Sequence, residues 1–281
     1  MSIFSFLFKR KKAPKKKLGL ALGSGGAKGF AELGVLRAFE ENDIKFDLVG
    51  GSSIGSIIGA FYADGYTSTD IYEMLIRIKP SEIAGALILS METSGLKSVI
   101  DREIGYKNIE DLKKPFVCVA TEVEKGQERV FESGNVALAL CASSCYPPFF
   151  KPVEIDGERF VDGAFTNSIP ADRVKALGAD VIISVDISNR EDKPSLLSRI
   201  FPSYKSDVKE PWRKGYEYSD IVLNPDLSGF KPTSFLRARE IVHFQRFGEG
   251  LRIVQDRMNS KNYYMCNPSF DKDCFQDNPC K

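Results

Sequence analysis

Short apolar runs alternate with helix-patterned segments through residues 18–187, and this alternation constrains the fold more than any other feature. The predicted strands are residues 18–22, 47–50, 115–123 and 181–187. The predicted helices are residues 31–42, 54–62, 69–78, 135–145 and 170–177. The fourth is stopped by Pro147 and Pro148, and the fifth ends at Gly178. Strands that alternate with helices favour a parallel sheet covered by helices on both faces.

The first residues differ from the rest of the chain and are predicted to form a basic N-terminal arm, residues 1–17. Residues 9–17 hold seven Lys and Arg, and residues 1–18 contain no acidic residue. The apolar residues 3–8 precede these charges, which is the reverse of a secretory signal. An apolar anchor followed by cations fits peripheral contact with an anionic membrane, whereas a solvated tail has the same composition. We expect a cytoplasmic protein with this arm on the inner face of the membrane.

The composition excludes several classes of function. No run approaches the roughly 18 apolar residues of a membrane span, and outside the arm the chain is acidic, so no nucleic-acid partner is expected. His243 is the only histidine, which argues against the multi-histidine zinc sites of many enzymes. Any catalytic pair that uses histidine must therefore use His243.

A glycine-rich loop, residues 23–29, follows the first predicted strand and opens a helix. Such loops present backbone N–H groups to an anion. The Walker pattern ends in Gly-Lys-Ser/Thr and fails here, because Lys28 precedes Gly29 and Phe30 follows. The dinucleotide pattern Gly-x-Gly-x-x-Gly also fails, because its last glycine, counted from Gly23, falls on Lys28. An oxyanion hole built from Gly25 and Gly26 is the third possibility, since glycine lets backbone approach a substrate closely. The loop alone does not decide between them.

Residues 51–55, Gly-Ser-Ser-Ile-Gly, match the nucleophile-elbow pattern Gly-x-Ser-x-Gly around Ser53. The match lies between a predicted strand and a predicted helix, as that pattern requires. A serine in such a turn projects its oxygen above the sheet. The alternative is a simple helix cap made by Ser52 or Ser53.

A serine hydroxyl needs a base, and the sequence offers two. His243 lies in a helix-patterned stretch rather than a glycine-containing loop, which is typical of a structural histidine. Asp162 follows a short predicted strand and begins the small-residue turn Asp162-Gly163-Ala164, so its carboxylate could approach Ser53 as a general base. An aspartate at such a turn also bonds its own backbone, and that alternative stays open.

Together, the glycine loop, the elbow and Asp162-Gly163-Ala164 resemble the patatin-like phospholipases, which are serine acyl hydrolases. The resemblance covers about residues 17–190, and Ser24 departs from the family's glycine pattern. It implies a three-layer α/β/α sandwich with a mainly parallel central sheet. It also implies a Ser53–Asp162 dyad, an oxyanion hole at Gly25 and Gly26, and no metal or organic cofactor. The expected domain is residues 18–281, with a core at 18–190 and a less defined part at 191–281.

The resemblance implies that the substrate is an acyl lipid or phospholipid, cleaved by phospholipase A, lysophospholipase or esterase activity. The alternative is a catalytically silent regulatory or adaptor protein that retains the fold. The apolar residues 83–89 could line an acyl channel, and residues 196–201 could dip into a lipid interface. The polar, proline-containing residues 189–215 are predicted to form a mobile insertion.

Overall fold

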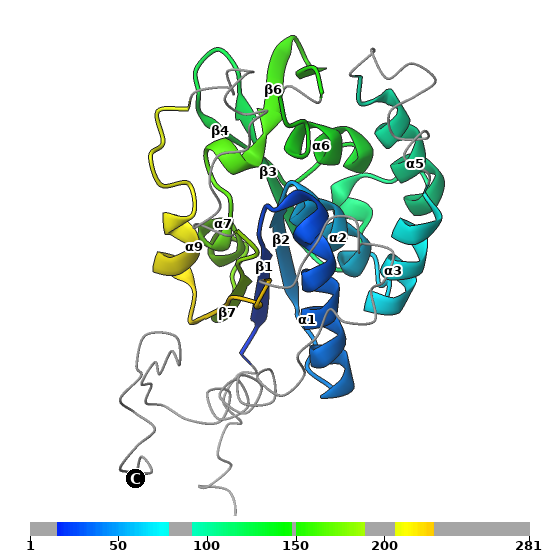
Figure 1. Ribbon diagram of the computed structural model, residues 1–281, viewed down its shortest axis with the longest axis vertical. Coiled ribbons are helices and arrows are strands. Elements are labelled where there is room, and N and C mark those ends of the chain that lie inside the picture. The colour runs from blue at the N-terminus through cyan, green and yellow to red at the C-terminus, as the bar shows by residue number, and fades with distance from the viewer. Residues whose placement is uncertain (1–15, 79–91, 148–149, 189–205, 228–281) are drawn as a thin grey trace, which may run out of the picture.

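The chain forms an α/β sandwich around one mixed sheet (Figure 1). The computed structural model describes residues 16–78, 92–147, 150–188 and 206–227. The sheet has the strand order β5-β6-β3-β2-β1-β7-β8, and β4 pairs with β3 beside this path. The strands are β1 (Leu18–Leu22), β2 (Leu48–Ser52), β3 (Phe116–Glu122), β4 (Glu128–Phe131), β5 (Val153–Ile155), β6 (Glu158–Asp162), β7 (Val181–Val185) and β8 (Ile221–Leu223).

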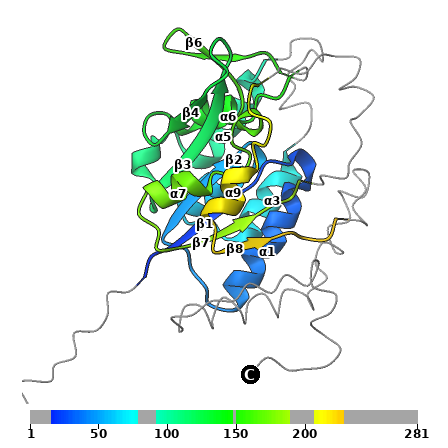
Figure 2. The same ribbon diagram turned by 90° about the vertical axis from the view of Figure 1, so that its left-hand side faces the viewer.

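Five neighbouring strands, from β3 to β8 along the sheet, are parallel, whereas β4 and β6 run antiparallel to β3 and β5 runs antiparallel to β6. The prediction of a mainly parallel sheet is confirmed. Figure 2 shows strands β8, β7, β1, β2 and β3 in succession, with α7 and α9 in front of them. Hairpin-like connections account for the antiparallel end, because β5 and β6 are joined by a tight turn that contains Gly157.

The helices lie on both faces of the sheet, as expected for strands joined by crossovers (Figure 1). The α-helices are α1 (Phe30–Glu41), α2 (Ile54–Ala63), α3 (Ser68–Arg77), α5 (Ser94–Ile104), α6 (Val136–Ser143), α7 (Ala171–Ala176) and α9 (Arg213–Tyr218). Short 3-10 turns are η2 (Gly26–Gly29), η3 (Ile109–Asp111) and η4 (Gly163–Phe165). The sequence pattern did not predict α5, α9, β5 or β8.

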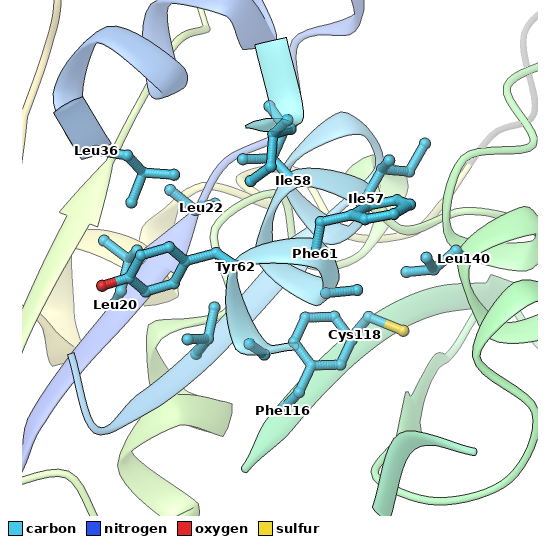
Figure 3. Packing of buried hydrophobic residues seen from close by; sticks show 14 of the residues in the cluster. Leu20, Leu22, Leu36, Ile57, Ile58, Phe61, Tyr62, Phe116, Cys118 and Leu140 are labelled. Atoms are coloured by element: carbon cyan, nitrogen blue, oxygen red, sulfur yellow. The ribbon is translucent and has the colours of Figure 1, made fainter. Parts of the chain in front are cut away.

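The alternation of side chains along β1 divides the core into two layers. Leu20 and Leu22 pack in the larger cluster with Ile58 and Phe61 of α2 (Figure 3). Ala21 points to the opposite face and belongs to a smaller cluster with Val174 of α7. Both faces are therefore buried, which explains why the strands are apolar without polar alternation.

Part of the region beyond residue 190 belongs to the same sheet. Ile221 of β8 pairs in parallel register with Ile183 of β7, and residues 213–215 of α9 belong to the stretch predicted as an insertion. That prediction was wrong for the described end of the stretch, because α9 buries Gly215 against Ile169. The remaining predicted features, at residues 1–15, 83–89, 196–201 and His243, lie outside the described residues. No helix in the described ranges has the length and hydropathy needed to span a membrane.

Candidate active site

Ser53 lies between the end of β2 and the first residue of α2, in a backbone conformation that serine rarely adopts. Its φ is 54° and its ψ is −127°, in the positive-φ region that costs a non-glycine residue on the order of 1–3 kcal/mol. Hydrogen bonds hold both sides of the residue. The Ser53 N–H donates to Ser143 Oγ at 3.0 Å, and the Ser53 carbonyl accepts from the Ser56 N–H at 2.8 Å and from Ser56 Oγ at 2.6 Å.

The two glycines of the elbow are required by close backbone contacts. A Cβ on Gly51 would lie 2.2 Å from the carbonyl oxygen of Gly55, and a Cβ on Gly55 would lie 2.6 Å from the carbonyl oxygens of Leu22 and Gly23. These neighbours are backbone atoms and cannot rotate away. The Gly-x-Ser-x-Gly spacing therefore follows from the tight approach of the turn to the first strand and to the glycine loop.

The side chain of Ser53 turns away from its helix and donates to Asp162. The distance from Ser53 Oγ to Asp162 Oδ2 is 2.6 Å, although the two residues are 109 positions apart in the sequence. The sheet register explains the meeting, because Ser52 of β2 pairs with Val119 of β3, and Ala120 of β3 pairs with Asp162 of β6. Ser53 and Asp162 thus lie at the same level on opposite sides of β3. The helix-cap alternative for Ser53 is wrong, since its side chain makes no cap hydrogen bond.

Asp162 also makes the local turn bond that the sequence allowed. Its Oδ1 accepts the N–H of Ala164 at 2.9 Å, so one oxygen holds the turn while the other meets Ser53. Gly163 is needed between them, because a Cβ there would lie 2.3 Å from the carbonyl oxygen of Val119. The two alternatives for Asp162 are therefore compatible, and the carboxylate does both at once.

Burial sets the electrostatics of this pair. Asp162 is 1% exposed and Ser53 is 7% exposed. Burial raises the pKa of Asp162 from 3.8 to about 7, against the lowering effect of the hydrogen bonds from Ser53 and the Ala164 N–H. A carboxyl group with this pKa is half ionised near neutral pH, where it can take up or return a proton.

The glycine loop packs directly against the elbow. A Cβ on Gly29 would lie 2.3 Å from Cγ1 of Ile54, the residue after Ser53. Gly26 has a φ of 56°, is exposed, and has open space where a side chain would stand. The loop is anchored on its other side, where the Ser24 N–H donates to the carbonyl of Ser168 at 2.9 Å. The structure thus brings the segment that holds Gly25 and Gly26 beside Ser53.

Two neighbours of the pair were not singled out in the sequence. Ser143 accepts the N–H of Ser53, and the carbonyl of Cys145 accepts the N–H of Asp162 at 3.1 Å. Ser143 is the last residue of α6, and Cys145 lies just beyond it. The sequence of this segment shows only that it is apolar and that Pro147 follows. In the described part of the chain, no three His, Cys, Asp or Glu side chains are grouped so that they could bind a metal ion.

These features define a class of protein, the α/β sandwiches that present a strained serine at a strand–helix turn, here paired with a buried aspartate. A sequence profile described as patatin-like phospholipase matches residues 20–175, which is more than half of the chain. The chain belongs to the patatin-like phospholipase family. The match includes the glycine loop, the elbow and Asp162.

Similar proteins carry related names. The chain is 31% identical over 271 residues to patatin-like phospholipase domain-containing protein 6 of Mus musculus, covering 90% of this chain and 20% of that protein. It is 35% identical over 191 residues to lysophospholipase nte1 of Aspergillus fumigatus, covering 63% of this chain and 12% of that protein. The chain therefore spans a fifth or less of the length of these relatives.

The fold also resembles solved structures at low sequence identity. VipD from Legionella pneumophila has a TM-score of 0.47 and 13% identity, with 67% of this chain and 52% of that chain covered. The type III effector protein ExoU has a TM-score of 0.44 and 16% identity, with 88% of this chain and 54% of that chain covered.

Proposed function

We propose that this protein hydrolyses acyl esters of lipids, with Ser53 as nucleophile and Asp162 as general base. The observation that carries the proposal is the 2.6 Å hydrogen bond from Ser53 Oγ to the buried Asp162 carboxylate. It joins a serine in a strained elbow to a carboxyl group whose pKa burial raises to about 7. A carboxyl group whose pKa is near the working pH is ionised in a large fraction of molecules, and its carboxylate is basic enough to take a proton from a hydroxyl group.

The first half-reaction transfers the acyl group to the enzyme. Asp162 takes the proton of Ser53 as Oγ bonds to the ester carbonyl carbon, and the carbonyl oxygen becomes an oxyanion. The proton then passes from Asp162 to the alcohol oxygen as the ester C–O bond breaks, so the alcohol leaves and an acyl-serine remains. In the second half-reaction Asp162 takes a proton from water, which attacks the acyl-serine. The fatty acid leaves, and Ser53 recovers its proton.

The N–H groups of Gly25 and Gly26 are proposed to hold the oxyanion. Support comes from the packing of the glycine loop against Ile54, immediately after Ser53, and from the open space at Gly26. A donor of this kind is worth about 3 kcal/mol of transition-state stabilisation. No metal or organic cofactor takes part in this mechanism.

The proposed substrates are phospholipids or lysophospholipids, supported by the names of the relatives. The alternative is a silent member of the family that serves as a regulator or adaptor. The geometry favours an enzyme. A φ of 54° at Ser53 does not by itself require a hydrogen bond to Asp162, whereas activation of the serine as a nucleophile requires a base.

A fluorophosphonate probe tests the proposal, since it reacts covalently with an activated serine. The wild-type chain should be labelled once and should hydrolyse p-nitrophenyl butyrate and lysophospholipid, whereas Ser53→Ala should do neither. Ser52→Ala is the matched control, because Ser52 is adjacent and buried and its hydroxyl has no hydrogen-bond partner among the described residues. Labelling of Ser53→Ala equal to that of the wild type contradicts the proposal, and an unlabelled wild type favours the adaptor.

We also propose that the basic arm, residues 1–17, attaches the protein to the inner, anionic face of a membrane. The support is the sequence pattern of an apolar hexapeptide followed by seven cations. Deletion of the arm should abolish sedimentation with vesicles that contain phosphatidylserine and should leave p-nitrophenyl butyrate hydrolysis unchanged. Equal sedimentation with and without the arm contradicts this attachment.

A further inference from the structure

The C-terminal end of α6 contacts both members of the Ser53–Asp162 pair. Ser143, the last residue of α6, accepts the N–H of Ser53 at 3.0 Å through its hydroxyl oxygen. Two residues later the carbonyl of Cys145 accepts the N–H of Asp162 at 3.1 Å. Residues 143–145 therefore bridge two residues that are 109 positions apart, one at the turn between β2 and α2 and the other at the end of β6.

Ser143 is in a position to control the conformation of the nucleophile. Ser143 is fully buried, and its hydroxyl oxygen accepts the Ser53 N–H; a buried backbone N–H that loses its partner costs free energy. The carbonyl of Ser53 is held independently by Ser56 at 2.8 and 2.6 Å. With both sides of the residue tied, the φ of 54° is maintained and the side chain points at Asp162 rather than at its own helix.

We propose that Ser143 is a positioning residue that holds Ser53 in its reactive conformation through the hydrogen bond from the Ser53 N–H. This inference rests on the proposed function, because it assigns Ser143 a task only if Ser53 attacks an ester. Ser143 transfers no proton and touches no substrate. Its effect passes through the direction of the Ser53 side chain, since a nucleophile displaced by about 1 Å loses up to about 100-fold in rate.

Ser144 provides a matched control within the same segment. Its hydroxyl is buried and has no hydrogen-bond partner among the described residues. Truncation of Ser144 removes a hydroxyl of the same size from the same end of α6 without touching Ser53. A general effect of mutation at this end of the helix should therefore appear equally in Ser143→Ala and Ser144→Ala.

The test measures fluorophosphonate labelling, where the end point counts competent sites and the rate constant reports attack by Ser53. Ser143→Ala should reach the wild-type end point with a rate constant and a kcat lowered about 10- to 100-fold, with KM for p-nitrophenyl butyrate unchanged. Ser143→Thr, which keeps the hydroxyl, should restore most of the rate. Ser144→Ala should behave as the wild type.

Each outcome decides the inference. A wild-type labelling rate in Ser143→Ala, or a lower end point with an unchanged rate constant, overturns it. If Ser143→Ala does not fold, Ser143→Cys replaces it, because a thiol has a similar size and is a weak acceptor. A wild-type labelling rate in Ser143→Cys also overturns the inference. Activity in Ser53→Ala removes the proposed function itself, whereas an inactive Ser53→Ala with a fully active Ser143→Ala removes only the role of Ser143.

Discussion

Replacement of Asp162 by asparagine is expected to stabilise the folded protein at pH 8 while it abolishes ester hydrolysis. The carboxyl group is 1% exposed, and burial raises its pKa from 3.8 to about 7. Between about pH 4 and pH 7, the Asp162 carboxyl is therefore mostly protonated in the folded state and mostly ionised in the unfolded state. Stability from this group is present at low pH and is lost as pH rises from about 4 through about 7.

The size of the effect follows from the pKa difference. A shift of about three units corresponds to about 4 kcal/mol at a pH above both values. Asparagine can reproduce the contacts, because its oxygen can accept the Ala164 N–H while its amide group faces Ser53 Oγ. The variant lacks the buried charge, so at pH 8 it should exceed the wild type in stability by up to about 4 kcal/mol. At pH 4 the difference should nearly vanish.

Urea unfolding followed by the fluorescence of Trp212, the only tryptophan, measures this difference at pH 4 and pH 8. The p-nitrophenyl butyrate assay on the same samples should show no turnover by Asp162→Asn. A variant that is less stable than the wild type by the same amount at both pH values refutes the reasoning, because Asp162 would then carry no penalty of ionisation. Full activity of Asp162→Asn refutes its role as a base.

Three further outcomes follow from the same geometry. The kcat/KM of the wild type on a neutral ester should rise about tenfold per pH unit below an apparent pKa near 7, the value for Asp162, and then level off; an acid limb near pH 4 contradicts this. Gly55→Ala should lower both Tm and activity strongly, because its Cβ would lie 2.6 Å from backbone oxygens. Gly59→Ala in the same helix should change Tm by a few degrees at most, because its Cβ would meet only side-chain atoms, at 3.2 Å. Equal effects of the two substitutions would show that the elbow can relax. Glu32 of α1 is fully buried, and burial raises its pKa well above 4.5, so the Tm of Glu32→Gln relative to that of the wild type should increase as the pH rises above 4.5; a difference independent of pH would contradict the raised pKa.

The local units of the fold could be predicted because their signals involve neighbouring residues. The apolar run of β1, the glycines after it and the spacing of α1 lie within one stretch of sequence, and the same holds for β2, the elbow and α2. The predicted sandwich and the family are confirmed. Helix α9 and strand β8 were missed, because their few residues acquire order only from packing on Ile169 and pairing with β7.

The candidate site divides in the same way. The elbow spacing and the Asp162-Gly163-Ala164 turn are visible in the sequence as short patterns, although the contacts that require Gly55 and Gly163 come from the distant residues Leu22, Gly23 and Val119. That Asp162 faces Ser53 could not be derived from the residues alone, since the contact depends on β6 running antiparallel beside β3. The catalytic role of the pair stays a prediction, and the labelling experiment tests it.

What the sequence by itself determined is the set of local turns, the alternation of strands and helices and the three motifs that identify the family. Only the tertiary structure decided which residues meet, because register across β3 sets the distance from Ser53 to Asp162. It also decided the contact of Ser143 with Ser53 and the burial of the Asp162 carboxyl. Hydrogen bonding between distant segments and desolvation are properties of the packed chain, and no spacing along the sequence encodes them directly.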